Sequence, residues 1–522
     1  MPHGVETRLI ERIAPMVREL VATEARALAD LRYADVRVEV SEGKFAAAEN
    51  GSAKSSGDDY AFAFGIRVLA GSRMSAPGYF GRGLGAADVP ELPRLLREGL
   101  LAAYRRAMAN AEMKAEVKGK FGALGDALTD TRLHPIPVRQ ETVPAVFEVD
   151  PRAVALDDMQ RLTVDVSRRV AGSDPALSYN YVSTLTQLSR ELFASSEGAL
   201  IDQSFALTQG MCYVVATGPD NSQELYDVLG HQRGWEILTG GVAEPLIVFP
   251  PFPEFARALA REAAELCRAP ALSAPAGPVT VVTDPHYNTL LSHEIIGHPV
   301  ELDRGLKMET AYAGRSWLLR GLDDTRIGKR IASPLVTAFS DPSLPGYGHY
   351  AYDHEGTPAR RVVHIDRGMF TGFMNSRQTA AVFGGDPNGH WKATDASLVP
   401  LVRMSTTVFG PGDHDAGDLI ADVEHGYYLV GHRTPSIAES RENFRISARK
   451  VYEIDRGRLG RLYRDGGIMA DSRDYLMNVD GVGRDFRLYP IPNCGKGQPM
   501  QTRKLGNGGP TLRSRAVLTG GV

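Results

Sequence analysis

The 522-residue sequence has few of the features that mark secreted or membrane proteins. It contains only three cysteines, Cys212, Cys267 and Cys494, without a paired framework, which favours a reducing compartment. The first 31 residues mix charged with apolar positions and lack the apolar core of a signal peptide. No later stretch is apolar enough to span a bilayer. We therefore expect a cytoplasmic protein without a membrane anchor.

An excess of positive charge is also missing. The formal net charge is -4 at pH 7 and the pI is near 6.4, so the chain offers no general attraction to nucleic acid or anionic lipid. The Gly-x-Ser-x-Gly frame of many serine hydrolases does not occur. The glycine-rich residues 506–510 lack the Lys-Ser/Thr of a phosphate-binding loop, so we predict a terminal turn there. We expect no direct contact with nucleic acid.

What is present is the composition of a large globular protein, with 43% hydrophobic and 23% charged residues. A chain of this length exceeds one ordinary core. We predict an α+β protein with an N-terminal α/β domain at residues 1–240, in which the turn-rich residues 119–144 offer a further break. A β-rich C-terminal catalytic domain follows at residues 241–522 and carries the metal-binding helix described below.

Hydrophobic periodicity predicts helices and strands in a definite order. Helical patterns cover residues 5–28, broken or kinked near Pro15, and then residues 90–114, 156–170 and 255–266. Strand patterns cover residues 33–40 and 59–69, and a meander at 178–216 has expected turns at 195–198 and 208–210. The glycine-rich residues 78–85 are predicted to be a turn. Residues 363–368 and 452–457 share one pattern, a strand entering an Asp-x-Gly turn, which indicates either two similar hairpins or a weak duplication.

The most informative positions are residues 293–298, with the sequence His-Glu-Ile-Ile-Gly-His. Two imidazoles can hold a divalent transition metal, and the carboxylate of Glu294 can take a proton from water. On a regular helix, a spacing of five residues turns His298 by roughly 140° from His293, so the rings would diverge. We therefore predict a π-type turn at residues 295–297, which restores a common face. The alternative is a buried helix with two hydrogen-bonded histidines.

The residues around this motif permit such a helix. Asp284 is the expected N-cap, and Pro285 stands at the first helical position. Gly297 lowers the cost of an irregular backbone, and Pro299 cannot donate a backbone hydrogen bond. The pattern predicts a helix that starts at Pro285 and widens before it ends.

Further segments resemble the TldD/PmbA family of bacterial and archaeal metallopeptidases. The similarity runs in order along most of the chain and is most specific from residue 280 to 500. Its strongest segments are residues 297–303, 352–360, 365–380 and 494–498, and weaker ones are 33–37, 65–68 and 196–198. The resemblance implies that His293, His298 and Cys494 ligate one zinc ion per chain, with Glu294 as the catalytic base. It also implies a homodimer or a heterodimer with a paralogous member.

Several positions leave alternatives open. Glu301 and Glu355 are rival third ligands, which we interpret as outer contacts or substrate-facing groups. Cys494 lies in a Pro/Gly/Asn-rich segment that we predict to be an exposed loop, whereas Cys212 is expected in a buried strand and Cys267 at the end of an amphipathic helix.

The chain also departs from the family pattern at Pro299, His354 and residues 388–392. These differences affect the expected substrate contacts and leave the expected metal ligands unchanged. His354 also lies close in sequence to His349 and His364. A second metal site formed by these three histidines is weighed and disfavoured, because they lack regular ligand spacing.

The resemblance and the motif together predict a zinc peptidase that acts on peptides or unfolded polypeptides. A thiolate ligand donates more charge than a third imidazole, so turnover is expected to be modest. The competing hypothesis is a non-catalytic or weakly catalytic modulator in which the metal site is structural. Peptide cleavage that a chelator and Glu294→Gln both abolish would separate the two.

Overall fold

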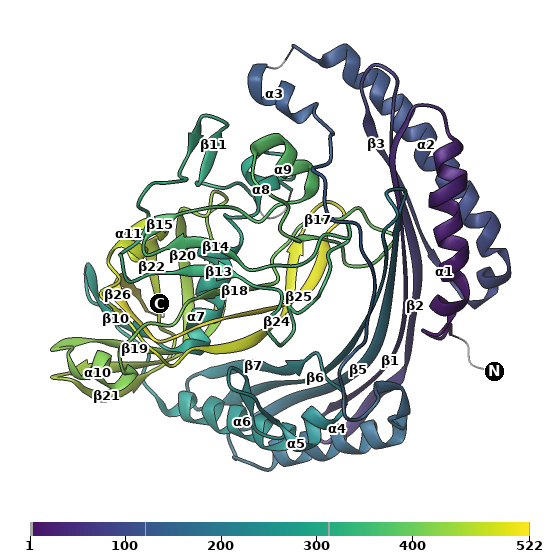
Figure 1. The fold of residues 1–522 in the computed structure, drawn as a ribbon. Helices are drawn as coiled ribbons and strands as arrows, with labels where there is room; N and C mark the ends of the chain where they lie inside the picture. The colour runs from purple at the N-terminus through teal and green to yellow at the C-terminus, as the bar shows by residue number, and fades with distance from the viewer. Residues whose placement is uncertain (1–3, 121, 312–313, 521–522) are drawn as a thin grey trace.

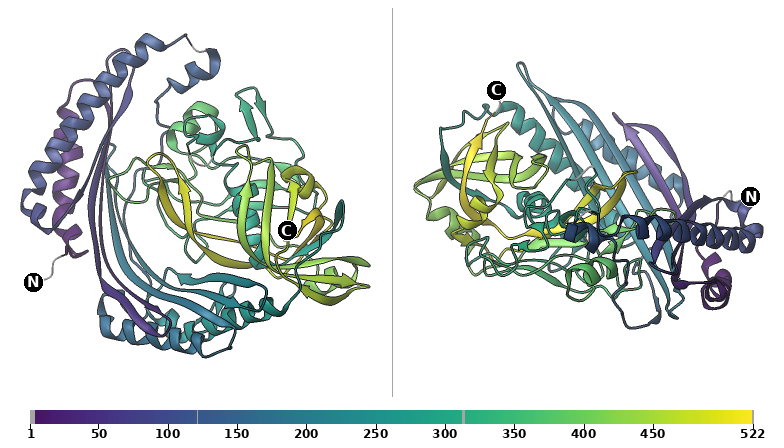
Figure 2. Two further views of the ribbon diagram at one scale, coloured as in Figure 1. Left: turned by 180° about the vertical axis from the view of Figure 1, so that it is seen from behind. Right: turned by 90° about the horizontal axis from the view of Figure 1, so that it is seen from above.

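The structure, a computed structural model, describes residues 4–120, 122–311 and 314–520. A long curved sheet from the first half of the chain wraps around a β-rich body from the second half (Figures 1 and 2). Helices cover the outer, convex side of the sheet, and the body lies inside its curve. The α+β fold class is confirmed, and the division at residue 240 stays a prediction. None of the described helices has the length and hydrophobicity needed to cross a bilayer.

The curved sheet has the strand order β3-β2-β1-β5-β6-β4, with β7 also paired to β6. Its neighbours are antiparallel except for β4, which runs parallel to β6. The strands are β1 (Leu31–Glu49), β2 (Ser52–Ala70), β3 (Ala76–Leu84), β4 (Gln140–Val143), β5 (Leu177–Ser195), β6 (Leu200–Thr217) and β7 (Ser222–His231). The strands β1 and β2 extend beyond the predicted patterns at 33–40 and 59–69, and the added residues 52–58 of β2 are exposed or half-buried, so no buried alternation marks them in the sequence.

Four amphipathic helices pack on this sheet, close to their predicted positions: α1 (Leu9–Glu19), α2 (Leu92–Val117), α4 (Leu156–Ala171) and α6 (Phe252–Arg268). The helix α1 is not broken at Pro15, because it continues through this residue and widens only later, in the π turn Leu20–Glu24. Residue 121, inside the predicted break at 119–144, lies outside the described residues. Next to it the chain forms the short helix α3 (Gly122–Leu128).

Two predicted turns are instead parts of strands. Residues 78–85 lie almost wholly in β3, and residues 208–210 lie inside β6. A Cβ added at Gly78 would sit 2.0 Å from the Ala103 carbonyl oxygen of α2, and one at Gly210 would sit 2.6 Å from the Phe252 ring of α6. These glycines allow close packing of helices on the sheet, which the sequence does not distinguish from a turn.

The second half contains two larger sheets, besides short two-stranded ones. In one, β10 (Pro278–Thr283), β19 (His425–Ile437), β20 (Asn443–Asp455), β22 (Gly467–Asp471) and β26 (Leu512–Thr519) pair in sequence order, and β26 also pairs back to β10 to close a ring. The other has the order β15-β14-β13-β18-β25-β24. Its strands are β13 (Ala338–Ser340), β14 (Val362–Asp366), β15 (Met369–Phe370), β18 (Thr406–Phe409), β24 (Arg487–Lys496) and β25 (Gln501–Gly509).

The two Asp-x-Gly segments form similar tight hairpins. Arg367 and Gly368 have φ of 45° and 82°, and Arg456 and Gly457 have φ of 48° and 72°. Positive φ at both central residues is the type I′ geometry that suits a two-residue hairpin. The predicted turn at 506–510 is wrong, because residues 506–509 end β25 between β18 and β24. This strand contributes a side chain to the site described next.

Candidate metal centre

The segment that carries the two histidines is a helix that changes its winding. Asp284 caps the helix α7 (Pro285–Ser292), accepting a hydrogen bond from the Tyr287 amide at 2.7 Å. The chain then enters a π turn at His293–Gly297, where the His298 amide donates to the His293 carbonyl at 3.2 Å. A Cβ at Gly297 would lie 2.0 Å from the Met404 sulfur, so a side chain here would require Met404 to move. The predicted cap and π turn are confirmed.

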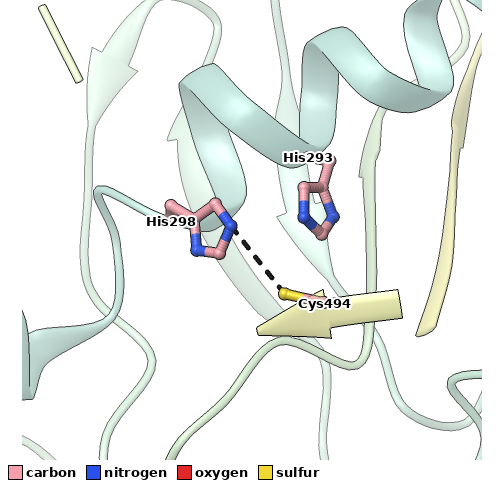
Figure 3. A group of neighbouring side chains, drawn as sticks. All are labelled: His293, His298 and Cys494. Carbon is pink, nitrogen blue, oxygen red and sulfur yellow. Dashed lines mark hydrogen bonds between the residues drawn. The ribbon is translucent and has the colours of Figure 1, made fainter. Parts of the chain in front are cut away.

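The π turn brings both imidazoles to one side of the helix, facing Cys494 (Figure 3). The ring centroids lie 4.7 Å apart with their planes at 84°. The Cys494 sulfur lies 3.8 Å from Nε2 of His298, and one ligand atom from each residue falls within 4.8 Å of the others. The structure therefore brings the three predicted ligands together, and all three are buried.

Each imidazole is held through its other nitrogen. Nδ1 of His293 lies 3.2 Å from Oδ1 of Asn507, whose own amide nitrogen donates to the Thr407 carbonyl at 2.8 Å. This second bond fixes the amide so that its oxygen accepts from Nδ1. Nδ1 of His298 lies 3.3 Å from Oε2 of Glu301. Both contacts leave Nε2 as the nitrogen available to a metal, as is common for metal-bound histidine.

Glu301 belongs to a buried ionic group behind His298. Its Oε2 accepts from Nε of Arg304 at 2.5 Å and lies 3.4 Å from Nζ of Lys496, which also pairs with Asp303 at 2.6 Å. Burial alone would raise the pKa of Glu301, but the two cations hold it well below its ordinary value. Glu301 is therefore a charged acceptor that orients His298, one of the outer roles expected for it.

Cys494 is not in an exposed loop, so that prediction is wrong. It lies in β24, and its residue is 2% exposed. The pairing of β24 with β25 shifts register between Ile491 and Cys494, an irregularity that fits the Pro/Gly/Asn-rich sequence and alters the direction of the strand. Burial raises the pKa of the thiol, but His298 and Arg403 more than offset this and lower it, which favours the thiolate.

These donors fit a zinc ion. In tetrahedral coordination, the usual Zn–N and Zn–S distances separate the nitrogen from the sulfur by about 3.6 Å. The observed 3.8 Å between His298 and Cys494 agrees with this spacing. Burial lowers the pKa of His293, which favours the neutral imidazole that coordinates metals. Two imidazoles and a thiolate leave a fourth position for a water or a substrate oxygen.

The predicted base, Glu294, lies beside these ligands and contacts a residue that the sequence did not indicate. Its Oε2 is 2.6 Å from Nη1 of Arg441, in the loop between β19 and β20. Both side chains are about nine-tenths buried. No spacing or motif marks Arg441, which is 147 residues away from Glu294 in the chain. Asn507 was missed for another reason, because its glycine-rich surroundings indicated a turn.

Other motif-like segments meet in a second place, where the curved sheet contacts the body. Arg67 pairs with Asp35 at 2.5 Å and with Glu355 at 2.9 Å, and Arg377 pairs with Glu197 at 2.8 Å. Glu355 therefore joins the two halves of the chain and is not among the grouped donors.

His354 belongs to the same junction, between Arg37 and Glu191. His349 and His364 lie apart from it: His349 contacts the Pro342 carbonyl, and His364 contacts Ser340. Among the described residues, only His293, His298 and Cys494 form a group that can hold a metal ion.

Known proteins resemble this chain over long segments. Residues 276–521 match the family described as PmbA/TldA metallopeptidase C-terminal domain. A metalloprotease of Methanothermobacter thermautotrophicus is 32% identical over 363 residues, which cover 70% of this chain and 74% of that protein. A zinc metalloprotease TldD homolog of Saccharolobus solfataricus is 28% identical over 250 residues, or 47% of this chain and 52% of that protein.

Two solved structures share the fold along almost the whole chain. One, from Thermotoga maritima, is described as a modulator of a DNA gyrase and has a TM-score of 0.70 at 14% identity, covering 98% of this chain and 100% of that one. The other, TldE from Thermococcus kodakarensis, has a TM-score of 0.65 at 14% identity, covering 98% of this chain and 99% of that one. At this identity the likeness concerns the fold alone.

Proposed function

Because this chain belongs to the PmbA/TldD metallopeptidase family, we propose that it is a zinc-dependent peptidase with one zinc ion per chain, held by His293, His298 and Cys494. The observation that carries the proposal is the π turn that points both imidazoles at a buried cysteine. A bound zinc ion would polarise a peptide carbonyl and lower the pKa of a water molecule beside it.

In this proposal Glu294 moves the proton. It takes a proton from the attacking water as the water oxygen bonds to the carbonyl carbon, and later gives it to the nitrogen as the C–N bond breaks. Glu294 follows His293 directly in the chain, so the π turn that positions this ligand also positions the base. Asn507 and Glu301 hold the two rings throughout.

Peptides or unfolded polypeptides are the proposed substrates. His293 and His298 are each 4% exposed and Cys494 is 2% exposed, so a folded domain cannot reach them without rearrangement. A flexible chain in an extended conformation can enter a much narrower space. We also propose a cytoplasmic location and a dimer, either with a second copy or with a paralogous chain, which the presence of TldE among the structural relatives supports.

The proposal is tested by mapping the products of unstructured peptides with mass spectrometry. We expect cleavage by the zinc-loaded protein, and loss of cleavage both after chelation and in Glu294→Gln. Glu294→Gln should keep its zinc, because Glu294 is a base in this proposal, and should lose activity by about 10²–10⁴-fold. Loss of zinc together with activity would make Glu294 a ligand instead.

The second candidate function is a modulator or binding protein with a structural metal site. The descriptions of structural relatives as modulators of DNA gyrase favour it. Zinc-loaded protein that cleaves no peptide, while zinc removal lowers its melting temperature, would support this candidate against the peptidase.

A further inference from the structure

Lys496, two residues after Cys494 at the end of β24, is a lysine whose side chain is 0% exposed. Its Nζ donates to Oδ1 of Asp303 at 2.6 Å and to the Val402 carbonyl at 2.6 Å, and it lies 3.4 Å from Oε2 of Glu301. An ammonium group has three N–H donors, so these three oxygens account for all of them. Lys496 therefore has no donor left for a substrate, and its role lies in the segments that it holds together.

The contacts of Lys496 belong to two segments beside the proposed ligands. Glu301 directly precedes the short helix α8 (Leu302–Gly305), and Asp303 lies within it. Val402 lies in the short strand β17 (Leu401–Val402), and its amide donates to Oδ2 of Asp303 at 3.1 Å. Lys496 thus joins β24 to α8 and to β17 at a single point.

Through these contacts Lys496 also reaches His298. From Cys494 onward β24 pairs with β25 in a regular register, so Cys494 and Lys496, two residues apart, face the same side of the strand. On this side the Cys494 sulfur lies 3.8 Å from Nε2 of His298 (Figure 3). Glu301, which Lys496 contacts, lies 3.3 Å from Nδ1 of the same imidazole. The strand therefore approaches His298 twice, through the thiol at Nε2 and through Lys496 and Glu301 at Nδ1.

The sheet alone does not fix this end of β24. The strand is at the edge of its sheet, so β25 is its one neighbour there. The pairing with β25 also shifts register just before Cys494. A shift of this kind bends the strand locally, so the ladder by itself does not set how closely Cys494 approaches the helix. Lys496 holds the strand against α8 beyond the shift.

The charge balance of the buried group fits such a role. Lys496 and Arg304 pair with the carboxylates of Asp303 and Glu301, two cations with two anions. Desolvation offsets much of the attraction within such a group, so it adds little net stability. What it supplies is direction, because each donor meets a fixed oxygen. Lys496 should then matter more to the geometry of the site than to the stability of the fold.

We propose that Lys496 is a positioning residue, which sets the distance between the Cys494 sulfur and Nε2 of His298 and so makes the thiolate the third donor to the metal. This inference rests on the proposed zinc site. Without Lys496, the end of β24 is released from α8, and the thiolate moves away while both imidazoles still face the same side of the π turn.

The test uses the full-length protein with Co²⁺ in place of Zn²⁺, because a thiolate bound to Co²⁺ gives a charge-transfer band in the near ultraviolet. Lys496→Met keeps an unbranched side chain of similar length but removes the charge. Because this variant leaves Asp303 without its cation, Lys496→Met/Asp303→Asn is the second variant and removes the pair as a unit.

At saturating Co²⁺, we expect both variants to lose most of the charge-transfer intensity per bound ion, while the visible absorption of bound Co²⁺ persists. Their zinc affinity should fall by about 10–100-fold, measured by competition with a chromogenic chelator. Asp303→Asn alone should keep the band, since an amide oxygen can still accept from Lys496. A role in stability alone would not change the charge-transfer band of the folded protein.

Lys392→Met is the matched control. Lys392 is also a buried lysine, with its side chain 1% exposed, but it donates to Glu191 at 3.0 Å at the junction of the sheet and the body. Its replacement should keep both the band and the zinc affinity. A folded double variant with an undiminished band would overturn this inference. So would one that binds no Co²⁺, because the imidazoles should still hold the ion, and a double variant that does not fold would make Lys496 a residue of the fold instead.

Failure of the proposed function gives a different result. A wild-type protein that binds zinc but cleaves no peptide would overturn the peptidase and leave the role of Lys496 intact. A wild-type Co²⁺ protein without the charge-transfer band would overturn Cys494 as a ligand, and the role of Lys496 with it.

Discussion

At the scale of single residues, the orientation of each histidine depends on a partner that is not itself a proposed ligand. Asn507 accepts from Nδ1 of His293, and Glu301 contacts Nδ1 of His298. Lys496 and Arg304 in turn keep Glu301 charged. The proposed ligands are therefore surrounded by a second set of buried residues that orient them. Replacing a ligand and replacing one of these orienting residues should lower the metal affinity by different amounts.

Removal of the thiol should have the larger effect. In Cys494→Ala, one of three protein donors is lost, and we expect zinc content to fall well below one per chain, as measured by elemental analysis after dialysis. Cys267→Ala is the control, because Cys267 lies at the end of α6, where its thiol donates to the Ala216 carbonyl. Full zinc retention in Cys494→Ala would remove this cysteine from the site.

Loss of the outer contact should weaken the site without abolishing it. Asn507→Ala removes the acceptor of His293 Nδ1, and the zinc affinity should fall by about 10–100-fold, as is typical when such an orienting partner is lost. Competition with a chromogenic chelator measures this change. Asn493→Ala, at an exposed position beside Cys494, should keep the wild-type affinity. Equal affinities in the two variants would show that Asn507 does not orient the ligand.

At the scale of the element, one extra residue in a helical turn decides whether a site exists. The His298 amide donates a hydrogen bond to the carbonyl five residues earlier. In a regular helix the two imidazole rings would point apart, but in this wider turn they point to the same side. Gly297 packs against Met404, which would have to move to admit a side chain at this position. The short helix α8 (Leu302–Gly305) then places Asp303 and Arg304 in the ionic group behind His298.

Deletion of Ile296 tests this element. It would convert the spacing of the histidines to four residues, which can still hold a metal on a regular helix. It would also rotate everything after the turn by about 100°, and so carry Glu301 away from Lys496, its buried partner on β24. We expect a clear fall in melting temperature by calorimetry, even where some zinc is retained. An unchanged melting temperature would mean that the π turn is not coupled to the packing behind it.

At the scale of the whole molecule, buried charges join the curved sheet to the body. Besides the pairs of Arg67 and Arg377, the junction contains Glu191, which accepts from Lys392 at 3.0 Å. Glu39 of β1 faces this group. Burial raises the pKa of Glu39 to about 8, with Glu191 and Asp395 adding to the shift, while Arg503 and Lys392 oppose it. The junction should therefore respond to pH.

Proton linkage determines whether the stability of the protein rises or falls with pH. Because the pKa of Glu39 is higher in the folded state than its ordinary value of 4.5, the folded protein binds more protons between about pH 4.5 and 8. Its contribution to stability is present below that window and is lost as the pH rises through it. Glu39→Gln removes this loss, so its melting temperature should match the wild type near pH 4.5 and exceed it near pH 8.

Melting temperatures measured across this range test the prediction. Glu112→Gln, at an exposed position on α2, is the control and should follow the wild type at every pH. A difference between Glu39→Gln and the wild type that does not grow with pH would show that Glu39 ionises normally in the folded protein.

The sequence by itself determined the local features of this protein. The α+β class, the four amphipathic helices, the cap at Asp284 and the π turn all followed from periodicity and spacing, because each depends on residues that are close in the chain. The convergence of His293 and His298 was predictable for the same reason. Cys494 was named from its resemblance to the family, and its surroundings in the sequence indicated an exposed loop rather than the buried strand that the structure shows.

Only the tertiary structure decided the contacts between distant segments. Gly78 and Gly210 proved to be points of close packing, and Asn507 and Arg441 joined the site from strands and loops far along the chain. Such contacts depend on how sheets and helices pack in three dimensions, and a single sequence leaves no periodic trace of them. The effect of the spacing between the histidines could therefore be predicted from the sequence. The side chains that orient the histidines and pair with the base could not, because they come from distant segments that only the packing brings together.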